Sequence, residues 1–289
     1  MKYCIVYLSS PQESKLTTGE YRYDMLCCSI KNTTKVFNDV PYIIFHEDLD
    51  DEHKNNILKI NENAIFEKLD FIREELDFKK FGRPKGYMLM CRFFSGEMQE
   101  YLIDHNYDSY IRFDDDSFLL EPIINKDELI NDLTKNDYIF RTIFFDGQKK
   151  YNNGIPMQSL YNFTLEYIKD KGYDVTKIYN FLYKNKIIDN NGLYTGIAPY
   201  NNFHATNLKL WKNPLIKDYI NKILECNGCL MNFWMDANIH SMIIFILCPL
   251  VNIPISIKTN FGYRHNRHFS ILNNFNFIYK ENEDFFMKN

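Results

Sequence analysis

Residues 109–116 read SYIRFDDD, a short apolar and polar segment that ends in three adjacent carboxylates. The residues up to Phe113 are extended in character, and the acidic run Asp114-Asp115-Asp116 follows at their carboxyl end. Open α/β sheets bind ligands in the crevice just beyond the carboxyl ends of their strands. The stretch therefore predicts a strand that delivers three carboxylates to the ligand-binding edge of a sheet.

The pattern around this strand alternates between strand and helix. Short β-branched and aromatic runs at 2–8 and 41–46 alternate with helical spacing at 20–31 and 50–60. Further helices are expected at 85–103, twice within 151–191, at 213–225 and at 236–248, with a short strand at 255–257. This alternating order implies parallel strands. We therefore predict an α/β fold with a mostly parallel central sheet flanked by helices, in a single domain over residues 1–289.

Composition and charge narrow the classes of partner. Of the 289 residues, 45% are hydrophobic and 16% aromatic, which is enough apolar material for a sizeable core. The net charge is −4 and the Lys and Arg residues are scattered, so nucleic acid is not an expected partner. The apolar runs within MKYCIVYLSS and at 239–251 are too short to span a bilayer. Seven cysteines without regular spacing are expected to be reduced thiols, which favours a cytoplasmic location.

The three adjacent carboxylates have two explanations. Because they repel one another, they form either a solvated acidic turn or a site for a cation. In an extended segment residues i and i+2 face the same way, so the D-x-D spacing pairs Asp114 with Asp116 and turns Asp115 elsewhere. Such a pair could hold Mg²⁺ or Mn²⁺ against a nucleotide diphosphate and stabilise the charge on a departing phosphate. That chemistry suits glycosyl transfer or phosphoryl hydrolysis.

Two later segments carry further candidates. His265 lies in a polar, cationic turn at 261–268, where a neutral imidazole could complete a metal site. Asp236 stands at the start of the helix expected at 236–248, where N-capping is the simplest explanation. His240 follows one turn later on the same face.

Five segments form an ordered set of motifs. They are 86–96 (GYMLMCRFFSG), 107–116 (YDSYIRFDDD), 200–204 (YNNFH), 234–241 (WMDANIHS) and 262–265 (GYRH). In this order they resemble Y-x-x-M-C-R-F-x-S-G, Y-D-Y-Y-x-R-V-E-P-D, Y-N-x-C-H, W-G-D-A-P-V-H-S and G-Y-x-H of the fungal α-1,2-mannosyltransferases of the Kre2/Mnt1 type, glycosyltransferase family 15. The resemblance extends over roughly residues 40–268.

The resemblance implies a GT-A-type (Rossmann-like) nucleotide-sugar-binding fold and a metal-dependent, retaining glycosyltransferase. It implies GDP-mannose as donor, Mn²⁺ or Mg²⁺ as cofactor, and a glycan or glycoprotein as acceptor. Matched motif by motif, it implies metal ligands at Asp114, Asp116 and His265, donor-binding residues at Tyr87, Arg92, Arg112, Asp114 and Tyr263, and residues of the transfer step at Asp236, Lys209 and His240.

Three features depart from the family's pattern. The family's E-P-D is Asp114-Asp115-Asp116 here, so the ligand geometry is expected to differ. With a one-residue gap, Lys209 stands where the family has a glutamate sometimes proposed as nucleophile, which leaves covalent and front-face routes open. The fungal enzymes carry an N-terminal membrane anchor, whereas no membrane span is expected from this sequence. The alternatives are a sugar-nucleotide or glycan-binding protein with weak or no transfer activity, and a metal phosphohydrolase.

Overall fold

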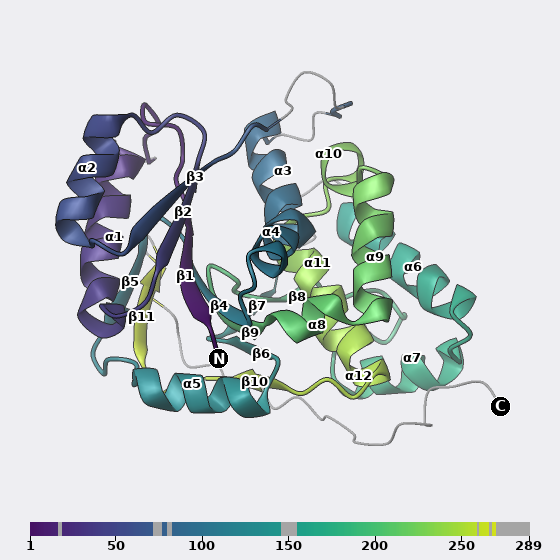
Figure 1. Cartoon of the computed structure of the whole chain (residues 1–289). Coiled ribbons are helices and arrows are strands. Elements are labelled where there is room, and N and C mark those ends of the chain that lie inside the picture. Colours follow the sequence, from purple (N-terminus) through teal and green to yellow (C-terminus); the bar gives the residue numbers. More distant parts are fainter. Residues whose placement is uncertain are drawn as a thin grey trace.

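The computed structural model describes residues 1–16, 19–71, 77–79, 83–145, 155–258, 260–265 and 268–269. A seven-stranded sheet in the order β10-β6-β9-β4-β1-β2-β3 lies at its centre (Figure 1). Its strands are β1 (Tyr3–Leu8), β2 (Tyr42–His46), β3 (Ala64–Lys68), β4 (Ser109–Phe113), β6 (Tyr138–Phe140), β9 (Phe203–Asn207) and β10 (Ile255–Ile257). Neighbouring strands pair in parallel except at β9, which runs antiparallel between β4 and β6. The predicted mostly parallel sheet is confirmed.

Helices cover both faces of this sheet (Figure 1). One face carries α1 (Arg22–Phe37), α2 (Asp51–Ile60) and α5 (Lys126–Lys135). The other side holds α3 (Lys85–Arg92), the π-helical turn η1 (Phe93–Glu97), α4 (Met98–Asp104), α6 (Ile155–Asp170), α7 (Val175–Lys184), α8 (Leu208–Lys212), α9 (Pro214–Glu225), α10 (Gly228–Asn232), α11 (Asp236–Met242), the π-helical turn η3 (Ile243–Leu247) and α12 (Cys248–Leu250). The helix expected at 85–103 is thus interrupted by η1.

Apolar side chains on both faces of the central strands create two cores. In β1, Cys4 and Val6 pack on the side of α3 and α4, whereas Ile5 and Tyr7 pack on the side of α1. Strands buried on both faces are typical of parallel sheets between helices. The two cores hold the sheet in place, so the carboxyl ends of its strands form a stable edge on which polar side chains can be arranged.

The strand order reverses at β1, which is the point where such sheets bind ligands. The chain passes from β1 to β2 on one side, and β4 pairs with β1 on the other. Two small sheets lie beside the main one. They are β5 (Ser117–Leu120) with β11 (Gly262–His265) and β12 (His268–Phe269), and β7 (Ile143–Phe145) with β8 (Ile197–Pro199). The first of these begins directly after the acidic run.

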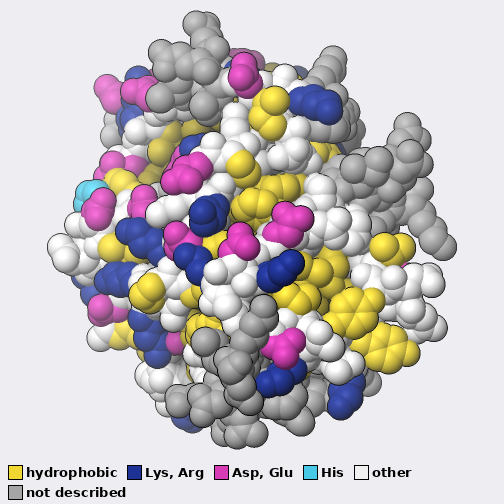
Figure 2. Space-filling view, turned by 90° about the vertical axis from the view of Figure 1, so that its right-hand side faces the viewer, with side chains coloured by type: hydrophobic (Ala, Val, Ile, Leu, Met, Phe, Trp, Pro, Cys, Tyr) yellow, Lys and Arg dark blue, Asp and Glu magenta, His cyan; other side chains and the backbone are white. Residues whose placement is uncertain are grey.

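The surface and the thiols agree with the composition. On the face shown in Figure 2, the described Lys and Arg side chains are intermixed with Asp and Glu rather than gathered into one basic surface. All seven cysteines are free thiols, as predicted. None of the described helices has both the length and the hydrophobicity that crossing a bilayer requires. The single-domain organisation of residues 1–289 stays a prediction.

Candidate active site

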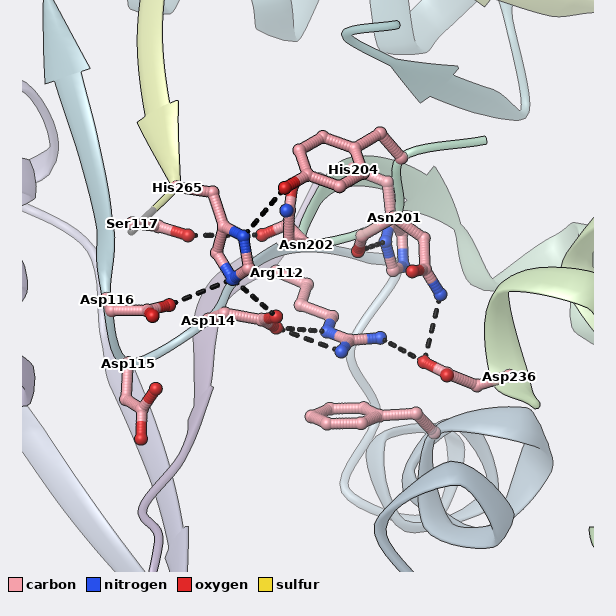
Figure 3. Close-up of polar contacts among 12 residues, drawn as sticks. Arg112, Asp114, Asp115, Asp116, Ser117, Asn201, Asn202, His204, Asp236 and His265 are labelled. Atoms are coloured by element: carbon pink, nitrogen blue, oxygen red, sulfur yellow. Dashed lines mark hydrogen bonds and ion pairs between the residues drawn. The ribbon is translucent and has the colours of Figure 1, made fainter. Parts of the chain in front are cut away.

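The acidic run forms a turn at the carboxyl end of β4. Ser117 N–H donates to Asp114 O (3.1 Å), which closes the turn, and Asp114 N–H donates to Asn202 O (3.1 Å) just before β9. The backbone is therefore bent rather than extended as expected. The side chains nonetheless separate as predicted, because Asp114 and Asp116 face His265 while Asp115 points away from it (Figure 3).

His265 reaches this turn through the pairing of β11 with β5. The antiparallel register places His265 opposite Ser117, directly after Asp116. Its Nε2 lies 2.9 Å from Asp116 Oδ1 and 3.4 Å from Asp114 Oδ2, and its Nδ1 lies 2.8 Å from Tyr200 Oη. Burial acts to lower the pKa of His265, but hydrogen bonds and charge from the two carboxylates outweigh it and raise the pKa to about 11. The three predicted metal ligands therefore converge.

Glycine and tyrosine make the approach of β11 to β5 possible. A Cβ on Gly262 would lie 2.4 Å from Glu121 O and 2.8 Å from the backbone of Leu120, so a larger residue would force the strands apart. Buried Tyr263 shares a hydrogen bond between its hydroxyl and Ser117 Oγ (2.7 Å), and it donates to Asn202 Oδ1 (3.1 Å). Tyr263, predicted to bind the donor, thus stabilises the turn through Ser117 and Asn202.

These residues fit a divalent cation by their chemistry. Two carboxylates and an imidazole suit Mn²⁺, and the hydroxyl of Tyr200 would orient the imidazole from its other nitrogen. Asp116 Oδ1 is buried, and besides the 2.9 Å ion pair with His265 the described residues offer it no hydrogen-bond donor. With the side chains in this arrangement, the described residues contain no group of three or more His, Cys, Asp or Glu with the spacing of a formed metal site. The imidazole stands between the carboxylates, where positive charge is favoured.

A buried arginine connects the turn to α11. The guanidinium of Arg112 is 2% exposed and donates through Nε (3.1 Å) and Nη2 (2.9 Å) to Asp114 Oδ1, and through Nη1 to Asp236 Oδ2 (2.9 Å). Asn201 Nδ2 donates to the same oxygen of Asp236 (2.9 Å). Burial acts to raise the pKa of Asp114, but Arg112 and His265 hold it well below its ordinary value. Asp114 is therefore ionised and fixed in direction (Figure 3).

The expectation that Asp236 caps its helix is wrong. The N-cap of α11 is Met235, and Asp236 is the first residue inside the helix, with its carboxylate turned to Arg112. The local preference for capping is overridden because a buried guanidinium needs a carboxylate more strongly than an N-terminal amide does. Asp236 accordingly lies at the predicted site, in contact with the residue that holds Asp114.

The π-helical turn η1 supports Arg112 from below. The ring of Phe94 lies 3.4 Å from the guanidinium carbon of Arg112, a cation–π stack. Because a π turn displaces the helical hydrogen bonds, Phe94 O is available to side chains, and it accepts from Gln99 Nε2 (3.0 Å) and His240 Nε2 (3.0 Å). The other nitrogen of His240 accepts from Tyr138 Oη (2.8 Å). His240 thus contacts the residue whose ring stacks on Arg112. It is buried and neutral, since burial lowers its pKa to about 4.

Two predicted residues are not brought to the carboxylates. Lys209 follows β9 at the end that pairs with Ser109, the opposite end of β4 from Asp114, and it forms a 2.7 Å ion pair with Asp137. Arg92 donates to Glu97 (2.7 Å) and to Leu224 O (2.9 Å) at the end of α9. Motif matching assigned both residues to the site. The direction of β9 carries Lys209 to the far end of the strand, and the side chain of Arg92 in α3 turns toward α9.

Tyr87 does border the site, at the start of α3. Its hydroxyl lies 3.7 Å from the sulfur of Met235, the residue before Asp236. Burial, with smaller contributions from Cys91, Asp236 and Asp114, raises the pKa of its hydroxyl. The phenol is therefore neutral, and its predicted role in binding the donor stays a prediction.

Sequence reasoning missed several residues that hold this site. Tyr200 and Asn201 contact His265 and Asp236, and their signal was the polar run YNN directly before β9. Ser10 and Arg22 contact Asp115, and no local pattern marks them because they lie 105 and 93 residues away. Tertiary contacts of this length leave no trace in periodicity.

Comparison with known proteins gives the fold a context. No protein-family model matches the chain. It is 26% identical over 187 residues to the glycolipid 2-alpha-mannosyltransferase of Saccharomyces cerevisiae, covering 64% of this chain and 40% of that protein. It is 28% identical over 207 residues to glycolipid 2-alpha-mannosyltransferase 1 of Candida albicans, covering 69% of this chain and 44% of that protein. The predicted similarity to fungal mannosyltransferases is confirmed, and the chain spans less than half the length of these relatives.

Two solved structures share the fold. Core-mannan synthase A from Aspergillus fumigatus, in its Mn/GDP form, superposes with a TM-score of 0.72 at 14% identity, covering 93% of this chain and 76% of that one. The mannosyltransferase Ktr4p from S. cerevisiae, in complex with GDP, superposes with a TM-score of 0.72 at 17% identity, covering 93% and 72%. The fold predicted from the sequence, that of GT-A mannosyltransferases, is confirmed.

Proposed function

We propose that this chain is a metal-dependent, retaining glycosyltransferase that moves mannose from GDP-mannose onto a hydroxyl of a glycan or glycoprotein, with α-1,2 linkage. The observation that carries the proposal is the convergence of Asp114, Asp116 and His265 at the carboxyl edge of the sheet. The names of the sequence relatives support mannosyl transfer, and the Mn/GDP and GDP forms of the fold relatives support the donor and the metal.

Asp114, Asp116 and His265 would hold the cation, Mn²⁺ or Mg²⁺. Bound there, it would supply positive charge to the diphosphate leaving group as the sugar bond breaks. The chain's own residues prepare this edge. Arg112 keeps Asp114 ionised and oriented, and Tyr200 sets the direction of the His265 ring. Asp236, fixed by Arg112 and Asn201, would border the sugar or the acceptor.

The test is GDP release and product formation from GDP-mannose with an α-mannoside acceptor, with and without Mn²⁺. We expect metal-dependent transfer by the unaltered chain and loss of it in Asp116→Ala and His265→Ala. A control variant is Lys126→Met, which breaks an exposed ion pair with Asp39 away from the site. Full activity of Asp116→Ala would refute the assignment.

The same assay separates the alternatives. Calorimetric binding of GDP-mannose without turnover on any acceptor would identify a sugar-nucleotide-binding protein. Phosphate release without sugar transfer would identify a phosphohydrolase. The three outcomes differ in whether a mannosylated product, free phosphate or neither is formed.

A further inference from the structure

The central carboxylate of the acidic run has contacts of its own on the side away from His265. Asp115 Oδ1 lies 2.7 Å from Arg22 Nη1, and Asp115 Oδ2 accepts from Ser10 Oγ (2.9 Å). Asp115 is 5% exposed. Ser10 follows β1 and Arg22 is the first residue of α1, so these contacts join the connection between β1 and α1 to the turn after β4.

We propose that Asp115, Arg22 and Ser10 form a clamp, the Asp115 clamp, that fixes the turn so that Asp114 and Asp116 face His265. The clamp rests on the proposed function, because its task is to position the carboxylates assigned there to the metal. Arg22 is thus a positioning residue that acts on the metal ligands through Asp115.

The geometry explains why such a clamp is needed. One described backbone bond, from Ser117 N–H to Asp114 O, closes the turn. Asp114 and Asp116 repel each other, which pushes the turn to rearrange unless it is anchored. Anchoring Asp115 from the opposite side opposes that rearrangement. A carboxylate as buried as Asp115 is tolerated only when it is paired and hydrogen-bonded, so the three residues depend on one another.

Arg22 could also act simply as a charge, and this alternative predicts the opposite result. Its guanidinium interacts electrostatically with Asp115 and, more weakly, with Asp116 and Asp114. A positive charge near a cation site weakens cation binding by repulsion. If charge alone mattered, removing Arg22 would tighten Mn²⁺ binding. If the clamp positions the ligands, removing Arg22 weakens it.

The experiment is calorimetric titration of the full chain with Mn²⁺, alone and in the presence of GDP. We expect Arg22→Met to bind Mn²⁺ about 10-fold more weakly, the lower end for outer residues of metal sites. Arg22→Lys should recover part of the loss, because one ammonium can still reach Asp115. The double variant Arg22→Met/Asp115→Asn removes one charge of each sign and so keeps the net charge. Because it still lacks the Asp115 clamp, it should also bind Mn²⁺ weakly. Lys126→Met, a cation removed from another ion pair, should bind like the unaltered chain.

Three results would overturn the clamp. They are equal or tighter Mn²⁺ binding by Arg22→Met, unaltered binding by the double variant, and a loss in Arg22→Met that Arg22→Lys does not reduce. Thermal unfolding of each variant identifies any that fail to fold. If Arg22→Met is one of them, the double variant Arg22→Met/Asp115→Asn decides, since Mn²⁺ binding by it equal to that of the unaltered chain refutes positioning. Asp116→Ala distinguishes failure of the proposed metal site from failure of the Asp115 clamp. If it still binds Mn²⁺, the proposed site is wrong, whereas loss of binding there with intact binding in Arg22→Met refutes the clamp alone.

Discussion

Replacing Arg112 by Met should damage stability and the site together. The side chain of Arg112 is buried between two carboxylates and stacked on Phe94. Methionine preserves much of the apolar contact with that ring but removes all five donors. The variant therefore leaves Asp114 and Asp236 without the charge that holds them.

The structure sets the magnitude of this effect. Removing one partner of a buried ion pair costs about 3–5 kcal/mol, because the remaining charge is left uncompensated. The carboxylate of Asp236 is 7% exposed, whereas that of Asp114 is 26% exposed and keeps its contact with His265. Asp236 also keeps the hydrogen bond from Asn201. We therefore expect a loss in the free energy of unfolding of about 3 kcal/mol, the lower end of that range.

The assay is urea unfolding of a double-mutant cycle. It compares Arg112→Met, Asp236→Asn and the double variant with the unaltered chain at pH 7. Residues in direct contact show coupling energies of about 0.5–3 kcal/mol, so the double variant should be more stable than the sum of the single losses predicts. Additive losses would refute the reasoning that Arg112 stabilises by compensating Asp236.

The dependence on pH gives a second check of the same reasoning. Because the folded chain holds the pKa of Asp114 below its ordinary value, its contribution to stability is present above about pH 3.9 and is lost as the pH falls further. Arg112→Met lacks the part of this contribution that Arg112 supplies, and keeps the part from His265. The stability difference between variant and unaltered chain should therefore narrow below about pH 4. A constant difference would contradict the assigned role of Asp114.

Three further predictions test the surroundings of the site. Gly262→Ala brings a Cβ within 2.4 Å of Glu121 O, so urea unfolding should show a loss of about 1–3 kcal/mol and Mn²⁺ titration should show weakened binding; unchanged binding would mean that β11 does not position the site. Burial lowers the pKa of His204 and His240, so their contribution to stability is complete above about pH 6.5 and is lost as the pH falls. The free energy of unfolding should therefore decrease from pH 6 to pH 4.5 by up to about 1.4 kcal/mol per pH unit for each histidine. His240→Gln should show a shallower slope. An unchanged slope in His240→Gln would mean that the His240 ring is charged in the folded chain. Lys209→Ala should transfer mannose at the rate of the unaltered chain, because this residue lies at the far end of β9, and a large loss of turnover would restore it to the transfer step.

Local patterns predicted the scaffold because its elements are locally encoded. The strand at Ser109–Phe113 and the helices near it carry their periodicity within the segment, and the rule of alternating elements supplies the parallel sheet. The antiparallel strand Phe203–Asn207 was not predicted. It is buried along its whole length between two parallel strands, so it shows no alternation of polar and apolar residues.

The site was harder to predict than the scaffold because its residues meet by register and by long-range pairing. The residues around His265 do not by themselves indicate its partners, since the pairing that places it opposite Ser117 joins strands some 150 residues apart. The direction of Asp115 followed from the i, i+2 rule, but its partner Arg22 lies 93 residues away. Spacing along the chain indicates the direction in which a side chain points, but it does not identify the residue that the side chain contacts.

Losing Arg22 and losing Arg112 should affect Mn²⁺ affinity and folding stability to different extents, and stability measurements alone would not show this. Arg22 is 33% exposed, so losing it should cost less folding energy than losing Arg112, even though buried Asp115 then loses its charged partner. Arg112 is fully buried, so losing it should cost both folding energy and the orientation of Asp114. If the clamp and the buried arginine both act on the metal site, Mn²⁺ affinity falls in both variants while stability falls strongly in one. A site in which affinity merely followed global stability would not show this divergence, so the pair of measurements tests whether the carboxylates are held by specific contacts or by the fold as a whole.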